Sequence, residues 1–577
     1  MNPLLRLFKF LLSTTWLPLF FAAVLGQLPP AQAQTPVFDL AVRQGVHSAA
    51  TGSQNSVVYA SAADAQGNLY ITGNFIGTVT FGSFTVSSPG GSVYVAKLDS
   101  RGNALWVNTA SAGGLGSGIA VDASGNIYCT GIYLSSSITF GTITISNNGF
   151  DGGYVAKLDT NGNWLWARNI EFVDGSTAGG RLALDGAGNA YLSGSFYTSA
   201  SFGGITLANT RSTADVYVAK IDAAGNWLWA RSAGSLSVND FSGGIAIDGN
   251  SNVYVAGTFQ ATASFGALSL SSAGGSDIFV AKLDATGNWQ WVRSAGSPDD
   301  DGGFSIATDH SNNVYVTGYV SPAAAFGSLT PPSIGYIDAF VAKLDAAGNW
   351  LWARSGGSIN SDAGSALTLD TNNNVYVAGY FSGPGTFGPT ALTQKGGGDL
   401  FVSKLDAAGN WQWSCSAGSS SADNVGNLSV DAAGNTYVTG YFLGDTASFS
   451  SIKLVNSRRG RNMGFVARIT TSPLANRHGE PLRAVQTVLF PSPAAAGAPT
   501  QLAVTGLPPH VQRIEVRLFD AAGRFIRSVG LRAQQGQSAG ELPTQGLASG
   551  LYLVQPYALD AQGQATLPLP SRHFLVR

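Results

Sequence analysis

Charge, cysteine and histidine are all scarce in this sequence. Asp, Glu, Lys and Arg make up 11% of the 577 residues, against about 25% in ordinary soluble domains. The 31 basic and 33 acidic side chains give a net charge of −2, which supplies none of the positive field that binding to a phosphate backbone requires. Two cysteines are too few for a disulfide framework, and five scattered histidines show no metal-ligand spacing. We therefore expect no nucleic-acid partner and a fold held together by packing.

Helical periodicity and catalytic motifs are also missing. No 3.6-residue apolar stripe is sustained after residue 33, whereas glycine occurs 74 times. The sequence has no Gly-x-Ser-x-Gly elbow, no His-Glu-x-x-His and no glycine-rich phosphate loop. We therefore expect an all-β protein, and we predict neither catalytic residues nor a cofactor, with calcium as the one weak exception treated below.

Residues 1–33 have the layout of a secretory signal peptide. A basic start with Arg6 and Lys9 precedes an apolar stretch at 10–26, which Pro18 interrupts, and the segment ends in Ala-Gln-Ala. A single membrane anchor is the alternative, but the apolar run is short, broken by proline and followed by a triplet that resembles a cleavage site. We predict cleavage before Gln34. Since no later apolar stretch is long enough to cross a bilayer, we expect no transmembrane segment in the mature chain.

One sequence element returns along most of the chain. The segment YVAKLDSRGNALW at 94–106 reappears as YVAKLDTNGNWLW, YVAKIDAAGNWLW, FVAKLDATGNWQW, FVAKLDAAGNWLW and FVSKLDAAGNWQW, and a shortened copy reads FVARIT. Its basic residue falls at Lys97, Lys157, Lys220, Lys282, Lys343, Lys404 and Arg468. The spacings of 60, 63, 62, 61, 61 and 64 residues indicate an array of supersecondary units with a period near 61.

Each unit carries two hairpin patterns, in which alternating apolar residues flank an Asp-x-x-Gly-Asn turn, so we expect four strands per unit. The first three strands occur seven times, but the fourth occurs only six times, because after Ile469 the chain runs into Thr-Thr-Ser-Pro. The missing copy lies at the other end, where FDLAVRQG at 38–45 aligns with WLWARSAG at 227–234. This count favours a ring of seven four-stranded blades closed by the N-terminal strand over an open solenoid, which needs a cap at each end.

Residues 38–470 resemble the SBBP family of β-propeller repeats. The resemblance rests on the Gly-Ile-Ala-x-Asp, Gly-Asn-x-Tyr-Val-x-Gly and Phe-Val-Ala-Lys-Leu-Asp elements and covers three quarters of the chain. The expected fold is all-β: a seven-bladed β-propeller at 34–470, a linker at 471–486 and a small C-terminal β-sandwich at 487–577. Since propellers host many unrelated functions, the resemblance implies little about chemistry.

The C-terminal region resembles another family. The segments FPSP at 490–493, LFDAAGR at 518–524 and SGLYLV at 549–554 are similar to elements of the C-terminal sorting domain of the type IX (Por) secretion system, although Ser492 stands where that family has Asn. This resemblance implies that the type IX machinery is a partner of residues 487–577. It also implies that the domain is removed when the protein is attached to the surface or released.

Several recurring residues are expected to serve as scaffold. Residues two apart in a strand share a face, and the fourth strands carry tryptophan pairs that we expect to pack between blades. The spacing from Ala342 through Asp345 and Gly348 to Trp352 is similar to the tryptophan-docking motif of pyrroloquinoline quinone propellers, which implies the same packing. The pairs are Trp164 and Trp166, Trp227 and Trp229, Trp289 and Trp291, Trp350 and Trp352, and Trp411 and Trp413. The lysine of Lys-Leu-Asp is expected to hydrogen-bond between blades. One phenylalanine per unit is expected in the core: Phe81, Phe140, Phe202, Phe265, Phe326, Phe387 and Phe449.

Four aspartates are the candidate ligand-binding residues. Asp240, Asp301, Asp362 and Asp423 each stand five residues before an apolar position of a first strand. A ring of carboxylates near a central channel could bind a cation, but an aspartate in such a loop more often accepts backbone N–H bonds. The run Asp299-Asp300-Asp301 is a candidate for calcium, although no EF-hand glutamate accompanies it.

The topology predicts where a site should lie. Both Asp-x-x-Gly-Asn turns of a blade fall at one end of the disc, so the second-to-third and fourth-to-first connections share the other end, here called the variable face. We hypothesise an exported, non-catalytic propeller that passes through the periplasm and acts at the cell surface or as a secreted protein, as an interaction or adhesion module for a glycan or protein. The alternative is a secreted carbohydrate-active enzyme, a hydrolase or lyase that uses acids of the variable face.

Overall fold

The computed structural model of the chain describes residues 34–576 with gaps at 48–54, 112, 148–150, 174–179, 210–212, 236–237, 457–459, 474–485, 491–499, 506–512, 521–524, 535–536, 546, 560–564 and 569–571. The predicted signal peptide lies outside the described residues. The described part is all-β, and it contains no helix with the length and apolarity needed to cross a membrane. The chain divides into two compact units, Met1–Leu474 and Ala475–Arg577.

Four sets of strands recur along the first unit. The first strands are β3 (Asn55–Ala63), β7 (Gly114–Val121), β13 (Arg181–Leu184), β19 (Phe241–Ile247), β23 (Gly302–Thr308), β27 (Ala363–Leu369) and β33 (Asp423–Val430). The second strands are β4 (Leu69–Phe81), β8 (Ile127–Tyr133), β14 (Ala190–Phe196), β20 (Val253–Phe265), β24 (Val314–Val320), β28 (Val375–Phe381) and β34 (Thr436–Phe442).

The third strands are β5 (Phe84–Leu98), β11 (Gly152–Leu158), β17 (Asp215–Ile221), β21 (Leu268–Leu283), β25 (Asp338–Leu344), β31 (Asp399–Leu405) and β37 (Met463–Pro473). The fourth strands are β6 (Ala104–Ser111), β12 (Trp164–Phe172), β18 (Trp227–Ser235), β22 (Trp289–Ala295), β26 (Trp350–Ser358), β32 (Trp411–Ala417) and β1 (Gln34–Gln44). Within each repeat, the first strand pairs antiparallel with the second, the second with the third and the third with the fourth.

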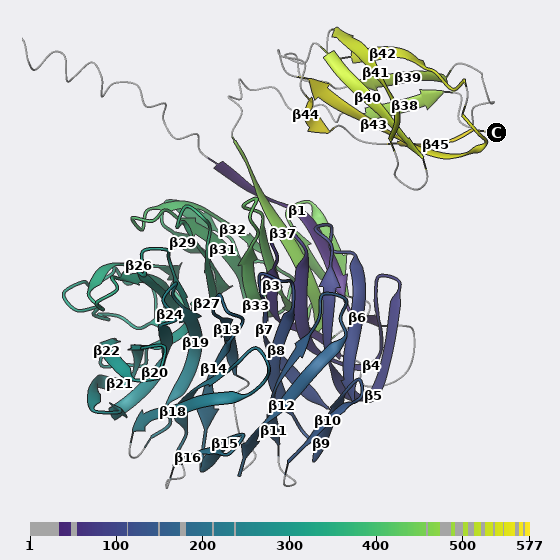
Figure 1. The fold of residues 1–577 in the computed structure, drawn as a ribbon. Coiled ribbons are helices and arrows are strands. Elements are labelled where there is room, and N and C mark those ends of the chain that lie inside the picture. The colour runs from purple at the N-terminus through teal and green to yellow at the C-terminus, as the bar shows by residue number, and fades with distance from the viewer. Residues whose placement is uncertain are drawn as a thin grey trace, which may run out of the picture. The chain divides into compact units, whose positions relative to one another are not determined.

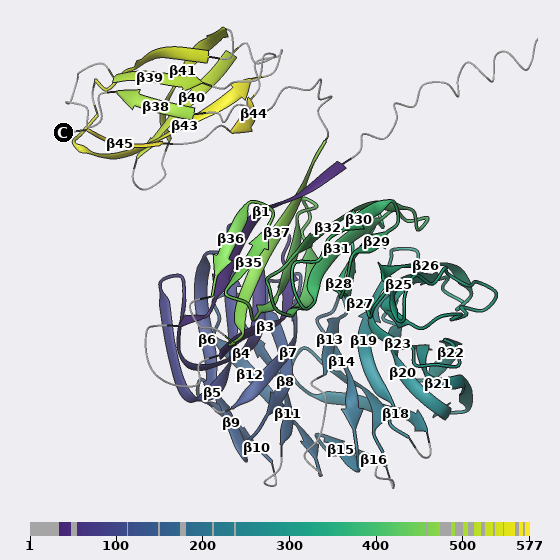
Figure 2. The same cartoon turned by 180° about the vertical axis from the view of Figure 1, so that it is seen from behind.

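The N-terminal strand completes the last repeat. β1 pairs antiparallel with β37, with Val42 opposite Val466, which confirms the pairing predicted from FDLAVRQG. Figures 1 and 2 show the purple β1 beside the green β37. The pairing reaches Gln34 opposite Pro473. Residues 471–473, which we had predicted to begin the linker, are therefore part of β37, because the N-terminal strand is long enough to give them partners.

The first strands surround a common channel. Neighbouring first strands contact one another in chain order, and β33 contacts β3. A cavity of about 180 Å³ is lined by residues from every first strand, among them Ala60, Ile245 and Leu428. Residues separated by most of the repeat region therefore lie close together here.

The second-to-third connections contain hairpins that the sequence analysis did not predict. The separate hairpin strands are β9 (Ser137–Phe140), β10 (Ile143–Ser146), β15 (Ser199–Phe202), β16 (Ile205–Ala208), β29 (Gly385–Phe387), β30 (Thr390–Leu392), β35 (Thr446–Phe449) and β36 (Ile452–Val455). The hairpins bond to the fourth strand of the preceding repeat, through β6–β9, β12–β15, β18–β20 and β26–β29. Single bridges do the same at Gly296–Ala325 and Gly418–Ser448, and β2 (Val46–His47), which follows β1, pairs with β4. Main-chain hydrogen bonds thus link neighbouring repeats.

The apolar core is a series of layers between repeats. One buried cluster joins Tyr128 and Trp166 of the second repeat to Leu192, Phe202 and Tyr217 of the third. The recurring phenylalanines stand in the hairpins and are at most 1% exposed, so their predicted core role is confirmed: Phe81, Phe140, Phe202, Phe265, Phe326, Phe387 and Phe449. Each repeat is therefore stabilised by apolar surface that only its neighbour can cover.

The second unit has its own antiparallel sheet. Its strands are β38 (Gln486–Phe490), β39 (Thr500–Thr505), β40 (Arg513–Asp520), β41 (Phe525–Gln534), β42 (Gln537–Leu542), β43 (Gly550–Leu559), β44 (Ala565–Pro568) and β45 (Arg572–Val576). They form one hydrogen-bonded path, because β41 pairs with both β40 and β42. Leu502, Val516, Leu518, Leu542 and Val554 come together in its core.

Candidate functional site

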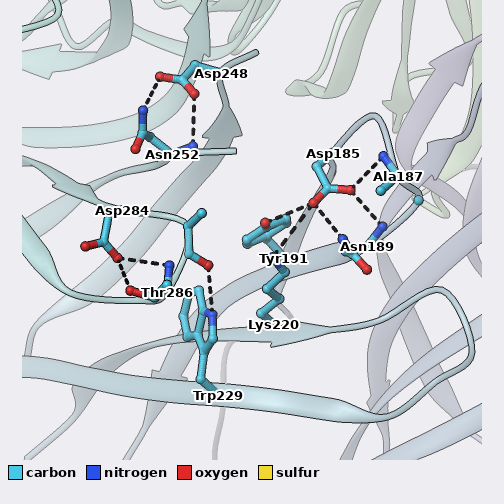
Figure 3. A network of polar contacts seen from close by, with 12 residues as sticks. Asp185, Ala187, Asn189, Tyr191, Lys220, Trp229, Asp248, Asn252, Asp284 and Thr286 are labelled. Atoms are coloured by element: carbon cyan, nitrogen blue, oxygen red, sulfur yellow. Dashed lines mark hydrogen bonds and ion pairs between the residues drawn. The ribbon is translucent and has the colours of Figure 1, made fainter. Parts of the chain in front are cut away.

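The Asp-x-x-Gly-Asn turns are built by the carboxylate of their own aspartate. Oδ1 of Asp185 accepts the N–H groups of Ala187 and Asn189 at 3.0 and 2.9 Å, and Oδ2 accepts Nδ2 of Asn189 at 2.8 Å and the hydroxyl of Tyr191 at 3.0 Å (Figure 3). Burial acts to raise the pKa of Asp185, but these hydrogen bonds outweigh it, and the pKa is lowered. With Gly188 at φ +78°, the turn is a structural device.

The lysine of the repeated Lys-Leu-Asp element acts mainly within its own repeat, which corrects our expectation of hydrogen bonds between blades. Nζ of Lys220 lies 3.9 Å from Oδ2 of Asp185 and 4.7 Å from the centroid of the Tyr191 ring (Figure 3). The same ion pair joins Lys343 to Asp309 at 3.6 Å and Lys404 to Asp370 at 3.5 Å. The reason is that the first turn of the same sheet places its aspartate within reach of the ammonium group. Lys157 is different, since it donates to the Ala223 carbonyl of the next repeat at 3.2 Å.

In three of the five pairs the second tryptophan hydrogen-bonds to the next repeat, in agreement with the predicted packing between blades. Nε1 of Trp229 donates to the carbonyl of Ala285, in a turn of the next repeat, at 3.3 Å (Figure 3). Trp166 and Trp291 make the same bond, each at 3.2 Å. The first tryptophan packs inside its own repeat instead, with the Trp227 and Phe202 rings 5.0 Å apart. Both positions are therefore used for packing.

Replacing Gly287 by alanine should test the contact between repeats. Gly287 has φ +86°, and a Cβ there would lie 2.8 Å from Cδ2 of Trp229. We expect Gly287→Ala to lower the free energy of unfolding by about 1–3 kcal/mol, because strain and overlap both act on the folded state. In Gly249→Ala, the added Cβ would have no atom within 4 Å. Urea unfolding of both variants measures the difference, and equal stabilities would contradict this role of Gly287.

The four candidate aspartates are buried in the fourth-to-first connections. Asp301 is 0% exposed, and its carboxylate accepts the N–H of Ser297 at 2.6 Å and that of Ser321, just beyond β24, at 2.7 Å. The other three accept N–H groups in the same way: Asp362 from Ser358 and Ser382, Asp240 from Ser235 and Gln260, and Asp423 from Ser419. This geometry favours the loop-fixing interpretation over ligand binding. None of the four is among the residues that line the channel cavities.

Three of the aspartates, Asp301, Asp362 and Asp423, have a second aspartate close by, which the sequence analysis missed. These partners belong to the third strands: Asp277 lies within β21, and Asp338 and Asp399 begin β25 and β31. A Cβ added to Gly357 would lie 2.6 Å from Oδ2 of Asp362 and 2.8 Å from Oδ1 of Asp338, so the two carboxylates meet over this glycine.

The carboxyl pKa values follow from this burial. Burial, helped by the negative charge of Asp277, raises the pKa of Asp301 to about 6 against the hydrogen bonds that lower it. Burial likewise raises the pKa of Asp423 to about 7, with Asp399 adding to the rise, and it raises those of Asp240 and Asp362. Two of these acids, Asp301 and Asp423, therefore take up protons near neutral pH.

The candidate calcium residues do not converge. Asp299 and Asp300 are exposed, and Oδ1 of Asp300 accepts the N–H of Ser276 at 2.9 Å. Asp301 is buried and its oxygens are turned toward serine N–H groups. In the part of the chain that the structure describes, no three His, Cys, Asp or Glu side chains are grouped so that they could hold a metal ion. Calcium binding stays a prediction.

Of the described residues that line the two channel cavities, Arg181 is the charged one. Arg181 of β13 lines both the channel cavity and a second cavity of about 280 Å³, which also includes Tyr59, Leu115 and Asn424. Leu115, Arg181 and Asn424 stand near the beginnings of their first strands, so the second cavity lies toward the variable face. Burial lowers the pKa of Arg181. The site predicted at the channel mouth therefore has a cation as its distinctive group, and the sequence analysis did not single it out.

A comparison of the repeats could have identified Arg181 from the sequence. It precedes its turn aspartate, Asp185, by four residues, and the corresponding positions of the other repeats hold Ala60, Gly118, Gly244, Ser305, Ala366 and Asn427. A residue that recurs in every unit serves the scaffold, so a single departure at a channel position was the feature to look for.

Comparison with known sequences identifies a repeat and two partial relatives. The Beta-propeller repeat family, SBBP, matches residues 228–258. An uncharacterized WD repeat-containing protein, L264 of Acanthamoeba polyphaga mimivirus, is 27% identical over 187 residues, which cover 27% of this chain and 13% of that protein. The regulatory protein FlaEY of Caulobacter vibrioides is 29% identical over 170 residues, which cover 28% of this chain and 18% of that protein. The chain thus spans less than a fifth of the length of these relatives.

Comparison with solved structures gives distant similarities. A puromycin hydrolase aligns with a TM-score of 0.34 and 12% identity, over 79% of this chain and 59% of that one. An ulvan lyase, a polysaccharide lyase, aligns with a TM-score of 0.38 and 11% identity, over 70% of this chain and 93% of that one. The family match, together with the repeated antiparallel sheets, identifies the chain as a β-propeller repeat protein.

Proposed function

We propose that residues 34–473 form a closed seven-bladed β-propeller that works as a non-catalytic interaction or adhesion module outside the cell. Closure is supported by the pairing of β1 with β37 and by the contact of β33 with β3. Arg468 adds to it, because its guanidinium donates to Asp39 of β1 at 2.6 Å and to the Ser100 carbonyl of the first repeat at 2.9 Å. A ring closed in this way leaves few free strand edges.

We favour binding over catalysis because the acids near the variable face are buried and hydrogen-bonded to the main chain. Asp240, Asp301, Asp362 and Asp423 are at most 5% exposed, and each accepts main-chain N–H bonds that fix its connection. A hydrolase or lyase needs an acid or base that reaches its substrate. In the described part of the chain, the residues lining the channel cavities include no Asp, Glu or His. The open part of this face is therefore suited to holding a ligand.

Export is the second element of the proposal. The Ala-Gln-Ala segment delivers the chain across the first membrane, and residues 487–577 act as a type IX sorting domain that carries it across the outer membrane. The division of the chain at residue 474 supports a removable C-terminal unit, since the repeat region contains the partners of its own strands. The proposed C-terminal β-sandwich is the form in which the secretion machinery would meet this unit.

One experiment tests export and function together. The full chain is produced in a bacterium that has the type IX machinery, and the exported form is analysed by mass spectrometry and screened against glycan and surface-protein arrays and for polysaccharide cleavage. We expect a mature form that starts at Gln34 and ends within 474–485, and that binds a ligand without turnover.

Alanine variants of the four connection aspartates complete the test. We expect Asp240→Ala, Asp301→Ala, Asp362→Ala and Asp423→Ala to lower stability by about 1–3 kcal/mol each while ligand binding persists in the folded fraction. Cleavage of a polysaccharide that is lost in variants that remain folded would support the enzyme alternative. An exported form that keeps Arg577 would show that the C-terminal unit is no sorting domain.

A further inference from the structure

Among the described residues that line the channel cavities, none offers a counter-charge to Arg181. Its Nε donates to the carbonyl of Gly243 at 3.4 Å, and its Nη1 to that of Ser117 at 3.2 Å. These acceptors belong to the next and the preceding first strands, so the guanidinium lies across three strands. Among the described residues, no Asp or Glu forms an ion pair with Arg181, and its Nη2 donates no hydrogen bond. A half-buried cation without an ion-pair partner favours the binding of an anion.

Arg181 is unnecessary for the scaffold. The other repeats build the same strand with alanine, glycine, serine or asparagine at this position. Holding the neighbouring strands together does not require a cation either, since the nearby junction uses Nδ2 of Asn427, which donates to the carbonyl of Ser61 at 2.7 Å. A long charged side chain in one of seven otherwise similar strands therefore points to a ligand.

We propose that Arg181 makes the channel mouth a binding site for an oxyanion, a carboxylate or sulfate group carried by the ligand of this propeller. The planar guanidinium matches the geometry of such groups and pairs with them through two parallel N–H bonds. This inference rests on the proposed binding function and names the chemistry of its ligand.

The dimensions of the site limit the rest of the ligand. The mouth cavity of about 280 Å³ is just below the usual range of small-molecule sites, which begins near 300 Å³. It therefore accommodates one acidic unit, such as a single uronic acid or sulfated sugar, with any further chain outside it. Tyr59 and Leu115 provide an apolar wall, and Asn424 provides an amide.

Calorimetric titration of the mature chain tests this site. The probes are sodium glucuronate and sodium sulfate, with glucose as the uncharged control and ionic strength held constant with sodium chloride. We expect at least one of the two anions to bind while glucose does not. Arg181→Gly, which installs the residue found at positions 118 and 244, should weaken anion binding about 10-fold or more, because a charge-assisted pair is lost. Arg181→Lys keeps the charge but loses the forked pair of N–H donors. Its affinity for the anion should therefore lie between that of the parent chain and that of Arg181→Gly.

The matched control lies at the other end of the disc. Arg101 occupies a turn position held by Ala224 in the third repeat, so Arg101→Ala removes an exposed arginine at no cost to the repeat pattern and should leave the affinity unchanged. Equal affinity of Arg181→Gly and the parent would overturn the proposal, as would an equal loss in Arg101→Ala or a parent chain that binds neither anion. If the parent binds a neutral glycan on the array but no anion, this inference fails while the proposed function stands.

Discussion

Removal of β1, residues 34–44, is expected to abolish the cooperative unfolding transition of the repeat region. The strand pairs with β37 from Gln34 to Gln44 and buries Phe38, which is 1% exposed and packs edge-on against Phe449 with ring centroids 5.4 Å apart. Its deletion removes the outer strand of the last repeat together with the salt bridge from Asp39 to Arg468. The cost is on the order of 5–10 kcal/mol, as large as the whole stability of an ordinary domain.

The exposed edge of β37 should also promote oligomers, because its unpaired N–H and C=O groups then lack partners. Thermal denaturation and light scattering measure the two effects. Phe38→Ala is a milder variant and should cost about 3–5 kcal/mol, whereas Val37→Ala on the neighbouring, outward-facing position should cost less than about 1 kcal/mol. A truncated chain that is monomeric and melts at the temperature of the parent would show that β1 does not close the ring.

Folded-state stability should fall as the pH rises from about 5 to 8. The pKa values of Asp301 and Asp423, about 6 and about 7, lie above the ordinary 3.8, so the folded chain holds more protons than the unfolded chain in this window. The stabilisation is complete below the ordinary pKa and is lost as the pH rises through the raised values. The turn aspartates act oppositely: hydrogen bonds lower the pKa of Asp185 and Asp309, so their contribution is lost in acid. We expect maximal stability between about pH 4 and 6.

The variant Asp338→Asn tests how much the pair of Asp338 and Asp362 contributes to this pH dependence. Among the described residues no donor reaches Oδ1 of Asp338, which faces the carboxylate of Asp362 across Gly357. An amide nitrogen at this place would donate to that carboxylate, so the variant should gain about 1–2 kcal/mol at pH 8 and less at lower pH, because the raised pKa of Asp362 favours its protonated form as the pH falls.

The control for this variant is Asp299→Asn, which removes an exposed carboxylate and should change stability by less than about 0.5 kcal/mol. Urea unfolding at a series of pH values gives both curves. An unchanged pH slope in Asp338→Asn would contradict the coupling of the pair. Stabilisation by added calcium that the substitution removes would instead identify the pair as a cation site.

The repeat pattern predicted most of the fold because it is a local property. The alternation of apolar residues around Asp-x-x-Gly-Asn sets strand and turn within a dozen residues, and the structure places Asp185 and Gly188 in their expected roles. The count of strands even predicted that the segment at 38–45 completes the last repeat, because its fourth strand was missing. The structure extends this pairing to Gln34 opposite Pro473.

The hairpins of the second-to-third connections could not be predicted from the repeat pattern. Their hairpins vary in sequence and find their hydrogen-bond partners on the preceding repeat, as β9 does on β6. A pairing between distant segments leaves no periodic signal inside either of them. The same holds for Lys220, whose partner proved to be Asp185 of its own sheet, 35 positions earlier in the sequence.

The sequence by itself thus determined the all-β class, the period, the four strands of a unit and the role of the N-terminal strand, because hydrophobic alternation and turn chemistry act over short distances along the chain. Only the tertiary structure decided which polar groups meet. It brought Asp338 against Asp362 and placed Arg181 in the channel with carbonyl partners from two other repeats. The physical reason is that burial and pairing of charge depend on the distances between repeats, and those distances are fixed by how the sheets pack.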